Sequence, residues 1–136
     1  MRVLVVGSGG REHALVWGLS RSPEVDEVVA APGNPGIGEL AALAPVRAND
    51  PADVARLADE LDADLVVVGP EEPLVNGAAD AVRARGRAAF GPGSAGAMLE
   101  GSKDWMKSLL AAARVPTAAY ASFDSFRFSS SKAKGA

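Results

Sequence analysis

The sequence predicts an α/β protein with a Rossmann-like, doubly wound parallel sheet. Four short apolar segments alternate with segments whose apolar residues recur at helical spacing. Each apolar segment is closed by a glycine turn, and residues 65–68 form a continuous apolar run, as expected for a central parallel strand covered on both faces. Ligands bind beyond the carboxyl ends of such strands, so the loops at those ends are the candidate site.

The first two strands are expected at residues 3–6 and 25–30. Gly7 ends the first strand, and helical spacing over residues 11–21 predicts the helix that follows. The turn of residues 32–36, with the sequence PGNPG, ends the second strand. This order of strand, glycine turn, helix and strand is the start of a right-handed doubly wound sheet.

The middle of the chain continues the alternation. Asp50 is a good N-cap and Pro51 suits the first helical position, so a helix is expected to begin there. Residues 64–68 form the third expected strand, residues 76–85 the next helix and residues 88–90 the fourth strand.

The pattern changes in the last third of the chain. Residues 94–99 indicate a short helical turn, and residues 102–113 a helix. The apolar side of this helix carries Trp105, Met106, Leu109 and Leu110. One more strand is expected at residues 119–123. Residues 125–136 are serine-rich and basic without any period, and we expect them to be disordered.

Composition restricts the classes of function. The chain has 136 residues and no cysteine, which predicts one core and excludes disulfides, thiolate metal sites and cysteine nucleophiles. The net charge of −3 becomes −6 for residues 1–124, because the tail holds three basic residues and no acid. We therefore expect no nucleic-acid partner. The sequence contains no apolar stretch long enough for a signal peptide or a membrane span, so we expect no membrane partner and a cytoplasmic location.

The loop after the first strand, residues 7–13 with the sequence GSGGREH, is the first candidate binding element. Glycines let a ligand approach the backbone, and the free amides at a helix start attract an anion, which favours a phosphate clamped by Arg11. Two alternatives remain: a tight turn without a ligand, and a dinucleotide site. The dinucleotide fingerprint requires a third glycine where this sequence has Glu12, and an acid after the second strand, which is absent. We expect the lone His13 to satisfy the helix rather than to act in catalysis.

Three further loops carry candidate residues. Asn34 either contacts a sugar hydroxyl or amine or sits in a left-handed turn. Glu71 and Glu72 lie in an expected loop, where they either face a ligand with hydroxyls or an amine or are simply solvated. Ser102 and Lys103 begin the last helix, where Lys103 is a candidate phosphate contact. We identify no catalytic residue, P-loop, zinc spacing or nucleophile elbow.

Taken together, these segments resemble the phosphoribosylamine-glycine ligase family, also called glycinamide ribonucleotide synthetase. The resemblance rests on the order and spacing of VLVVGSGGREHAL at residues 3–15, APGN at 31–34, VGPEEPL at 68–74, FGP at 90–92 and LEGSK at 99–103. It extends over about residues 1–124.

The resemblance implies a domain that precedes an ATP-grasp fold. In that family ATP and Mg²⁺ activate the carboxylate of glycine as an acyl phosphate, which the amine of 5-phosphoribosylamine attacks to give glycinamide ribonucleotide, ADP and phosphate. By the same resemblance, Gly9, Gly10, Arg11, Glu12, Asn34 and Glu71 line the phosphoribosylamine pocket. Lys103 would lie near the phosphates of ATP, and the metal ligands would lie outside this chain.

The resemblance also implies a division of the chain. We expect a substrate-binding α/β domain at residues 1–100, the start of a truncated ATP-grasp region at 101–124 and a tail foreign to the family at 125–136. The missing ATP-grasp domains would be the protein partner, and the fragment alone is expected to be inactive. The alternatives are a stand-alone module that binds a sugar phosphate or nucleotide without catalysis, an NAD-dependent domain, and a remnant without a ligand.

Overall fold

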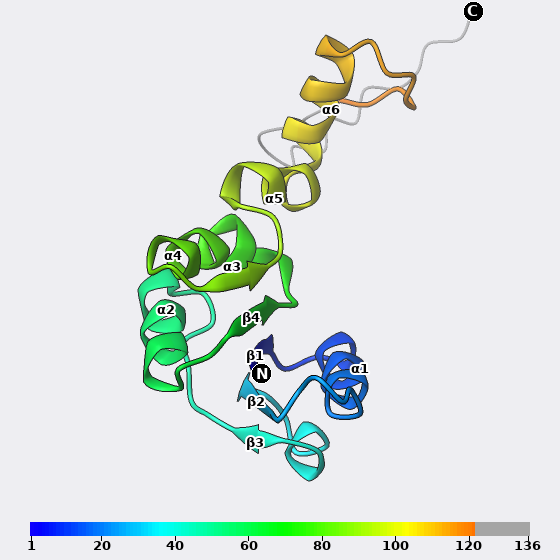
Figure 1. The fold of residues 1–136 in the computed structure, drawn as a ribbon. Coiled ribbons are helices and arrows are strands. Elements are labelled where there is room, and N and C mark those ends of the chain that lie inside the picture. Colours follow the sequence, from blue (N-terminus) through cyan, green and yellow to red (C-terminus); the bar gives the residue numbers. More distant parts are fainter. Residues whose placement is uncertain (122–136) are drawn as a thin grey trace, which may run out of the picture.

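A computed structural model describes residues 1–121 of the chain, and Figure 1 shows their fold. Five parallel strands form one sheet in the order β3-β2-β1-β4-β5. The strands are β1 (Arg2–Gly7), β2 (Glu27–Pro32), β3 (Ala42–Leu43), β4 (Leu65–Val68) and β5 (Ala88–Phe90). The predicted doubly wound parallel sheet is confirmed, because the chain runs outward from β1 in one direction and then crosses to build β4 and β5 on the other side.

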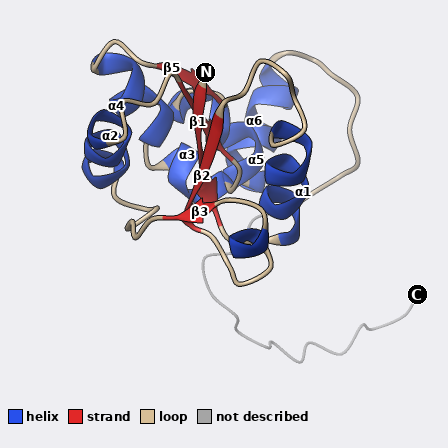
Figure 2. Cartoon of the chain, turned by 60° about the horizontal axis from the view of Figure 1, so that its bottom comes forward, coloured by secondary structure: helices blue, strands red, loops and turns tan. Residues whose placement is uncertain are grey.

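Helices cover both faces of this sheet, as Figures 1 and 2 show. One face carries α1 (Gly10–Leu19) and the short 3₁₀ helix η1 (Ile37–Glu39). The opposite face carries α2 (Pro51–Glu60), α3 (Glu71–Val75) and α4 (Ala78–Ala84). The chain then continues into α5 (Ser94–Gly101) and α6 (Lys103–Ala112).

The central strand β1 divides the core in two. Side chains of a strand alternate between its faces, so Leu4 and Val6 pack toward α2 and α4 while Val3 and Val5 pack toward α1. All four side chains are fully buried. Burial on both faces explains why the strand reads as an unbroken apolar run in the sequence.

The start of α2 follows the expected capping chemistry. The Asp50 side chain accepts hydrogen bonds from the backbone amides of Ala52 and Asp53, and Pro51 occupies the first helical position. Asp53 is itself buried and accepts hydrogen bonds from Arg47 and Arg56, which anchors the preceding loop to the helix. The predicted helix start at Asp50 is therefore confirmed.

Several predicted elements need correction. The second strand begins at Glu27, two residues after Val25, because Val25 is held in a turn by the carbonyl of Ser22. The short strand β3 and the helix η1 were not predicted, since two exposed residues and three residues carry too little periodicity. The loop expected at Glu71 is the helix α3, and α5 extends to Gly101.

The predicted strand at residues 119–123 is wrong for residues 119–121, which adopt no regular structure. Its last two residues and the tail expected at 125–136 lie outside the described residues. In residues 1–121, no helix is long and apolar enough to cross a membrane.

Candidate functional site

The carboxyl ends of the parallel strands bring the predicted loops to one edge of the sheet. β1 and β4 are neighbours, and the chain leaves β1 toward one face and β4 toward the other. This is the topological switch point, where an open α/β sheet forms a crevice between the diverging loops. The loops after residues 6 and 68 meet there through a direct contact.

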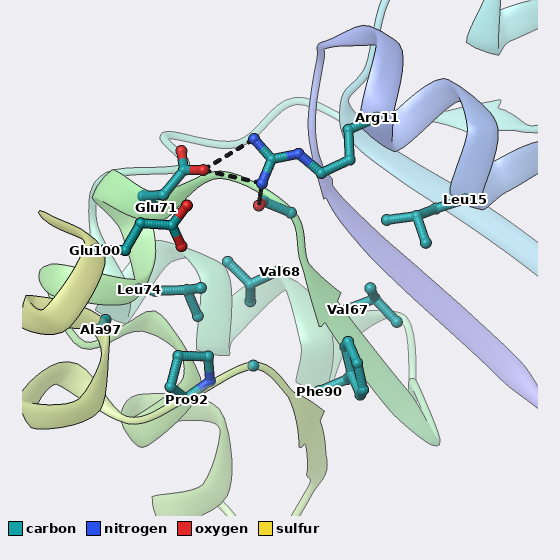
Figure 3. A pocket seen from close by; sticks show the side chains of 12 residues that line it. Arg11, Leu15, Val67, Val68, Glu71, Leu74, Phe90, Pro92, Ala97 and Glu100 are labelled. Atoms are coloured by element: carbon teal, nitrogen blue, oxygen red, sulfur yellow. Dashed lines mark hydrogen bonds and ion pairs between the residues drawn. The ribbon is translucent and has the colours of Figure 1, made fainter.

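Arg11 makes that contact from the first turn of α1. Its Nη1 donates to Oε1 of Glu71 at 3.0 Å and to the carbonyl of Gly69 at 3.1 Å, as drawn in Figure 3. The pKa of Glu71 is lowered, first by the hydrogen bond from its own backbone amide and then by Arg11. Glu71 is therefore a carboxylate at neutral pH, and the Arg11 side chain stays 59% exposed at the rim.

Glu12 lies beneath this rim rather than on it. The residue is 3% exposed, and its Oε2 accepts a hydrogen bond from the backbone amide of Gly9 at 2.7 Å, which is the N3-to-N-cap half of a capping box. Its carboxyl fills a space bounded by Gly7, Gly9 and Gly69, where a Cβ would collide with it at each position. Glycine is therefore required on both loops because the Glu12 side chain passes between them.

The buried carboxylate limits what the glycine loop can bind. Oε1 of Glu12 accepts no hydrogen bond from the described residues, and the nearest cation, Nε of Arg11, is 3.9 Å away. The Glu12 carboxyl already uses the Gly9 amide. Its side chain fills the space between the two loops at the position where the dinucleotide fingerprint has its third glycine, which argues against a dinucleotide.

Asn34 fixes the neighbouring loop. Its Nδ2 donates to the carbonyl of Ser8 at 2.8 Å, and its Oδ1 accepts from the amide of Ile37 at 2.9 Å. The ring of His13 packs against Gly36 in the same turn, within 3.0 Å of where a Cβ would stand. The side chain of Asn34 thus ties the turn to the glycine loop and keeps one N–H and one lone pair for a ligand.

A cavity of about 280 Å³ opens beside the Arg11–Glu71 pair. Its polar rim consists of Arg11, Glu71 and Glu100. Its apolar floor contains Leu15, Val67, Val68, Leu74, Phe90, Pro92 and Ala97 (Figure 3). Two carboxylates face one guanidinium there, so the rim has an excess of negative charge and favours hydroxyl or ammonium donors.

The structure therefore separates the predicted site residues. Arg11 and Glu71 meet at the cavity, Gly9 and Gly10 lie exposed beside them, Asn34 supports the adjacent loop, and Glu12 is buried below. Lys103 is exposed at the start of α6 and does not line the cavity. Glu100 and Phe90 were not predicted as site residues. Glu100 belongs to the LEGSK segment at residues 99–103, in which only Ser102 and Lys103 were given candidate roles.

Fold and site together define an α/β domain of the Rossmann-like class with its ligand cavity at the switch point of the sheet. The family model of the phosphoribosylglycinamide synthetase N domain matches residues 1–100, so the chain belongs to that family.

Similar curated proteins are phosphoribosylamine–glycine ligases. A phosphoribosylamine–glycine ligase of Agrobacterium fabrum is 53% identical over 123 residues, which cover 90% of this chain and 29% of that protein. One of Streptomyces coelicolor is 56% identical over 118 residues, covering 87% of this chain and 28% of the relative. The chain thus spans less than a third of the length of these relatives and corresponds to their N-terminal part.

Solved structures share the fold. A phosphoribosylamine–glycine ligase from Thermotoga maritima is 26% identical with a TM-score of 0.57, covering 82% of this chain and 25% of that chain. A phosphoribosylglycinamide synthetase from Anaerococcus prevotii is 16% identical with a TM-score of 0.64, covering 83% and 29%. A saccharopine dehydrogenase from Saccharomyces cerevisiae, 15% identical with a TM-score of 0.52 over 68% of this chain and 23% of its own, shares the fold alone.

Proposed function

We propose that this chain is the N-terminal, substrate-binding part of a phosphoribosylamine–glycine ligase of purine biosynthesis. The whole enzyme would join 5-phosphoribosylamine to glycine at the expense of ATP. The observation that carries the proposal is the Arg11–Glu71 pair at the rim of a cavity in a chain whose relatives, at more than 50% identity, bear that name. The fragment alone is expected not to turn over ATP.

The charges of the rim suit different groups of 5-phosphoribosylamine. Arg11 is exposed and stands next to the first-turn amides of Gly10 and Arg11 itself, so this side suits the phosphate. Glu71 is ionised and suits the ribose hydroxyls or the amine, and Asn34 can add one hydrogen bond from the neighbouring turn. Gly9 keeps the loop close to the ligand, and the buried Glu12 holds that loop in place.

ATP would be bound mainly outside this chain. Lys103 is exposed and solvent-facing at the first turn of α6, which leaves it available to a nucleotide phosphate held by a further domain. Among residues 1–121, no group of three or more His, Asp or Glu side chains is placed to hold a metal ion. Mg²⁺, in this proposal, is held by residues of the missing ATP-grasp domains and by the phosphates of ATP. The proposed enzyme works in the cytoplasm.

A second candidate is a stand-alone module that binds a sugar phosphate without catalysis. The observation in its favour is that the sheet, its covering helices and the cavity are formed almost entirely by residues 1–100. Such a body has the buried core that a domain needs to fold by itself. Both functions use the same pocket and differ only in whether further domains act on the bound ligand.

Calorimetric titration with ribose 5-phosphate tests the pocket. We expect saturable binding that Arg11→Ala weakens at least tenfold, because the substitution removes the exposed cation at the rim. Arg21→Ala is the matched control: Arg21 follows the end of α1 and lies over the Trp17 ring, so it should leave the affinity unchanged. Absence of binding, or an equal loss in the two variants, contradicts the pocket assignment. A further assay with ATP, glycine and phosphoribosylamine separates the two functions.

A further inference from the structure

The rim of the cavity carries a second carboxylate, Glu100, beside the Arg11–Glu71 pair. Glu100 lies one residue before the end of α5, and its side chain is exposed at the mouth of the cavity. Figure 3 shows its carboxyl group next to that of Glu71. The helices α3 and α5 thus bring one carboxylate each to the same side of the rim.

The position of Glu100 is fixed by contacts at both ends of α5. At the start of the helix, the amide of Ser94 donates to Oδ2 of Asp80 at 2.7 Å. At its end, Gly101 lies so close to α3 that a Cβ there would stand 2.5 Å from Cγ2 of Val75. Because glycine permits this approach, α5 packs against α3 and carries Glu100 to the rim.

The charges at this side of the rim do not balance. Arg11 forms an ion pair with Glu71 at 3.0 Å, and no cation of residues 1–121 forms an ion pair with Glu100. The pKa of Glu71 is lowered first by its own backbone amide and then by Arg11, and a hydrogen bond with the Glu100 carboxyl lowers it further. Two neighbouring carboxyl groups therefore have one guanidinium beside them, which leaves carboxyl oxygens available to a ligand that donates hydrogen bonds.

A primary amine matches this arrangement better than a hydroxyl does. A hydroxyl donates one hydrogen bond, whereas a neutral amine donates two and an ammonium three. An ammonium also offsets the charge of the second carboxylate. A neutral amine can donate one N–H to each carboxylate and keep its nitrogen lone pair for bond formation, as a nucleophilic amine requires.

The other side of the cavity indicates which amine is bound. Arg11 and the first-turn amides of α1 suit a phosphate, so a ligand with a phosphate at one end and an amine at the other matches both sides. Glycine also carries an amine, but so small a molecule leaves most of a cavity of about 280 Å³ empty. We propose that Glu100 acts with Glu71 to select the amine of an amino-sugar phosphate over the hydroxyl of the parent sugar phosphate. The inference rests on the proposed function and adds the residue that distinguishes the two ligands.

Two ligands that differ in one group test this selection. Ribitol 5-phosphate and 1-amino-1-deoxyribitol 5-phosphate share their carbon chain and phosphate and differ only in a hydroxyl or an amine at the first carbon. Both are titrated calorimetrically into the 136-residue chain and into its Glu100→Gln variant. Glu72→Gln is the matched control, because it removes an equal charge next to Glu71 from an exposed side chain that does not line the cavity.

We expect the wild type to bind the amine about tenfold more tightly than the hydroxyl, because the amine makes charge-assisted hydrogen bonds. Glu100→Gln should reduce this ratio to about twofold and change the affinity for ribitol 5-phosphate by less than about twofold, since only the amine loses a charged acceptor. Glu72→Gln should keep the ratio of the wild type. A wild type without preference for the amine overturns the proposal. So does an equal loss of affinity for both ligands in Glu100→Gln, which a merely structural role would produce.

A conservative variant and a second amine sharpen the test. Glu100→Asp keeps the charge on a shorter side chain and should retain more of the preference than Glu100→Gln, so the opposite order contradicts the selection. If circular dichroism shows that Glu100→Gln does not fold, Glu100→Asp carries the test: its ratio should fall below that of the wild type at unchanged affinity for ribitol 5-phosphate. Glycine is titrated in parallel. A loss of affinity for glycine in place of the amino sugar overturns the assignment to the sugar amine.

The outcome is separable from that of the proposed function. Equal affinities of the wild type for the two ligands, both weakened by Arg11→Ala, keep the pocket and remove the selection by Glu100. Binding of neither ligand removes the pocket assignment and the selection with it. A preference that depends on Glu100 keeps the inference even if this chain, joined to the remaining part of the Agrobacterium fabrum ligase, forms no glycinamide ribonucleotide, a result that removes the ligase assignment.

Discussion

The body of the molecule, residues 1–100, and the extension, residues 101–121, both form capped helices, but only the body buries them. Both contain helices with a capped start: Asp50 caps α2, and Ser102 caps α6 by accepting from the amide of Trp105. α2 then buries four apolar residues in the core, whereas α6 buries none. Local signals therefore suffice to begin a helix, but burial depends on a partner layer that only the body possesses.

Truncation of a central side chain should give the largest difference between the two regions. Leu4→Ala opens a cavity in the fully buried core and should lower the free energy of unfolding by about 2–5 kcal/mol. Leu109→Ala, at an exposed position of α6, should change it by less than ~0.5 kcal/mol. Urea denaturation followed by circular dichroism measures both. Equal losses would show that α6 is part of the cooperative core.

A substitution where the Glu12 side chain passes between the two site loops should give the next largest change in the free energy of unfolding. Gly69→Ala directs a Cβ into the Glu12 carboxyl and should cost about 1–3 kcal/mol, because this space is already filled. Gly18→Ala is the control in the same body: it meets no atom within 4 Å, lies inside α1 and should stabilise by roughly 0.5–1 kcal/mol. Thermal unfolding distinguishes them by the opposite sign of the change in Tm.

Asp53 makes the stability of the body depend on pH. The backbone amide of Arg47 and the Arg56 guanidinium hold the pKa of Asp53 far below its ordinary value. A depressed carboxyl pKa contributes stability above the unfolded-state pKa of about 3.9, and this contribution is lost as the pH falls through the folded-state pKa. Asp53→Asn should therefore lower Tm at pH 7, and its difference from the wild type should shrink steadily below pH 4. A difference independent of pH would refute the assigned role.

Removal of the cap of α6 should have the smallest global effect. Ser102→Ala removes the acceptor for the Trp105 amide and should destabilise this helix locally by about 1 kcal/mol. Hydrogen exchange should become faster for amides of residues 105–112, while the amides of β1 and β4 keep their protection. Faster exchange in the strands as well would mean that the extension and the body unfold together.

The sequence predicted the parts of the fold whose signals are strong and local. The start of α2 at Asp50-Pro51 and the strand β5 at residues 88–90 agree with the structure because caps, prolines and glycine turns act within a few residues. It failed at β3, where two exposed residues form a strand only because β2 lies beside them. It also failed at α3, where prolines and paired acids suggested a loop although Glu71 and Glu72 suit the first turn of a helix.

The candidate site was predicted in the same uneven way. Parallel strands place the loops that follow them at one edge of the sheet. The contact between the loops of Arg11 and Glu71 could therefore be predicted from the sequence. The burial of Glu12 between Gly7 and Gly69 was not, because those glycines are far apart in the chain and the collision they avoid exists only after β1 and β4 pair. The roles of Phe90 and Glu100 at the cavity likewise depend on tertiary contacts, the pairing of β5 with β4 and the packing of α5 against α3.

The sequence alone determined the class of the fold, the family to which the chain is similar and the edge of the sheet that carries the site, because periodicity, caps and glycine turns are written along the chain. Tertiary structure decided which residues of that edge line the cavity, which are buried beneath it and which helix buries no residue. These outcomes depend on contacts between segments up to about 60 positions apart, such as that of Arg11 with Glu71. Their geometry arises only when the strands are brought side by side.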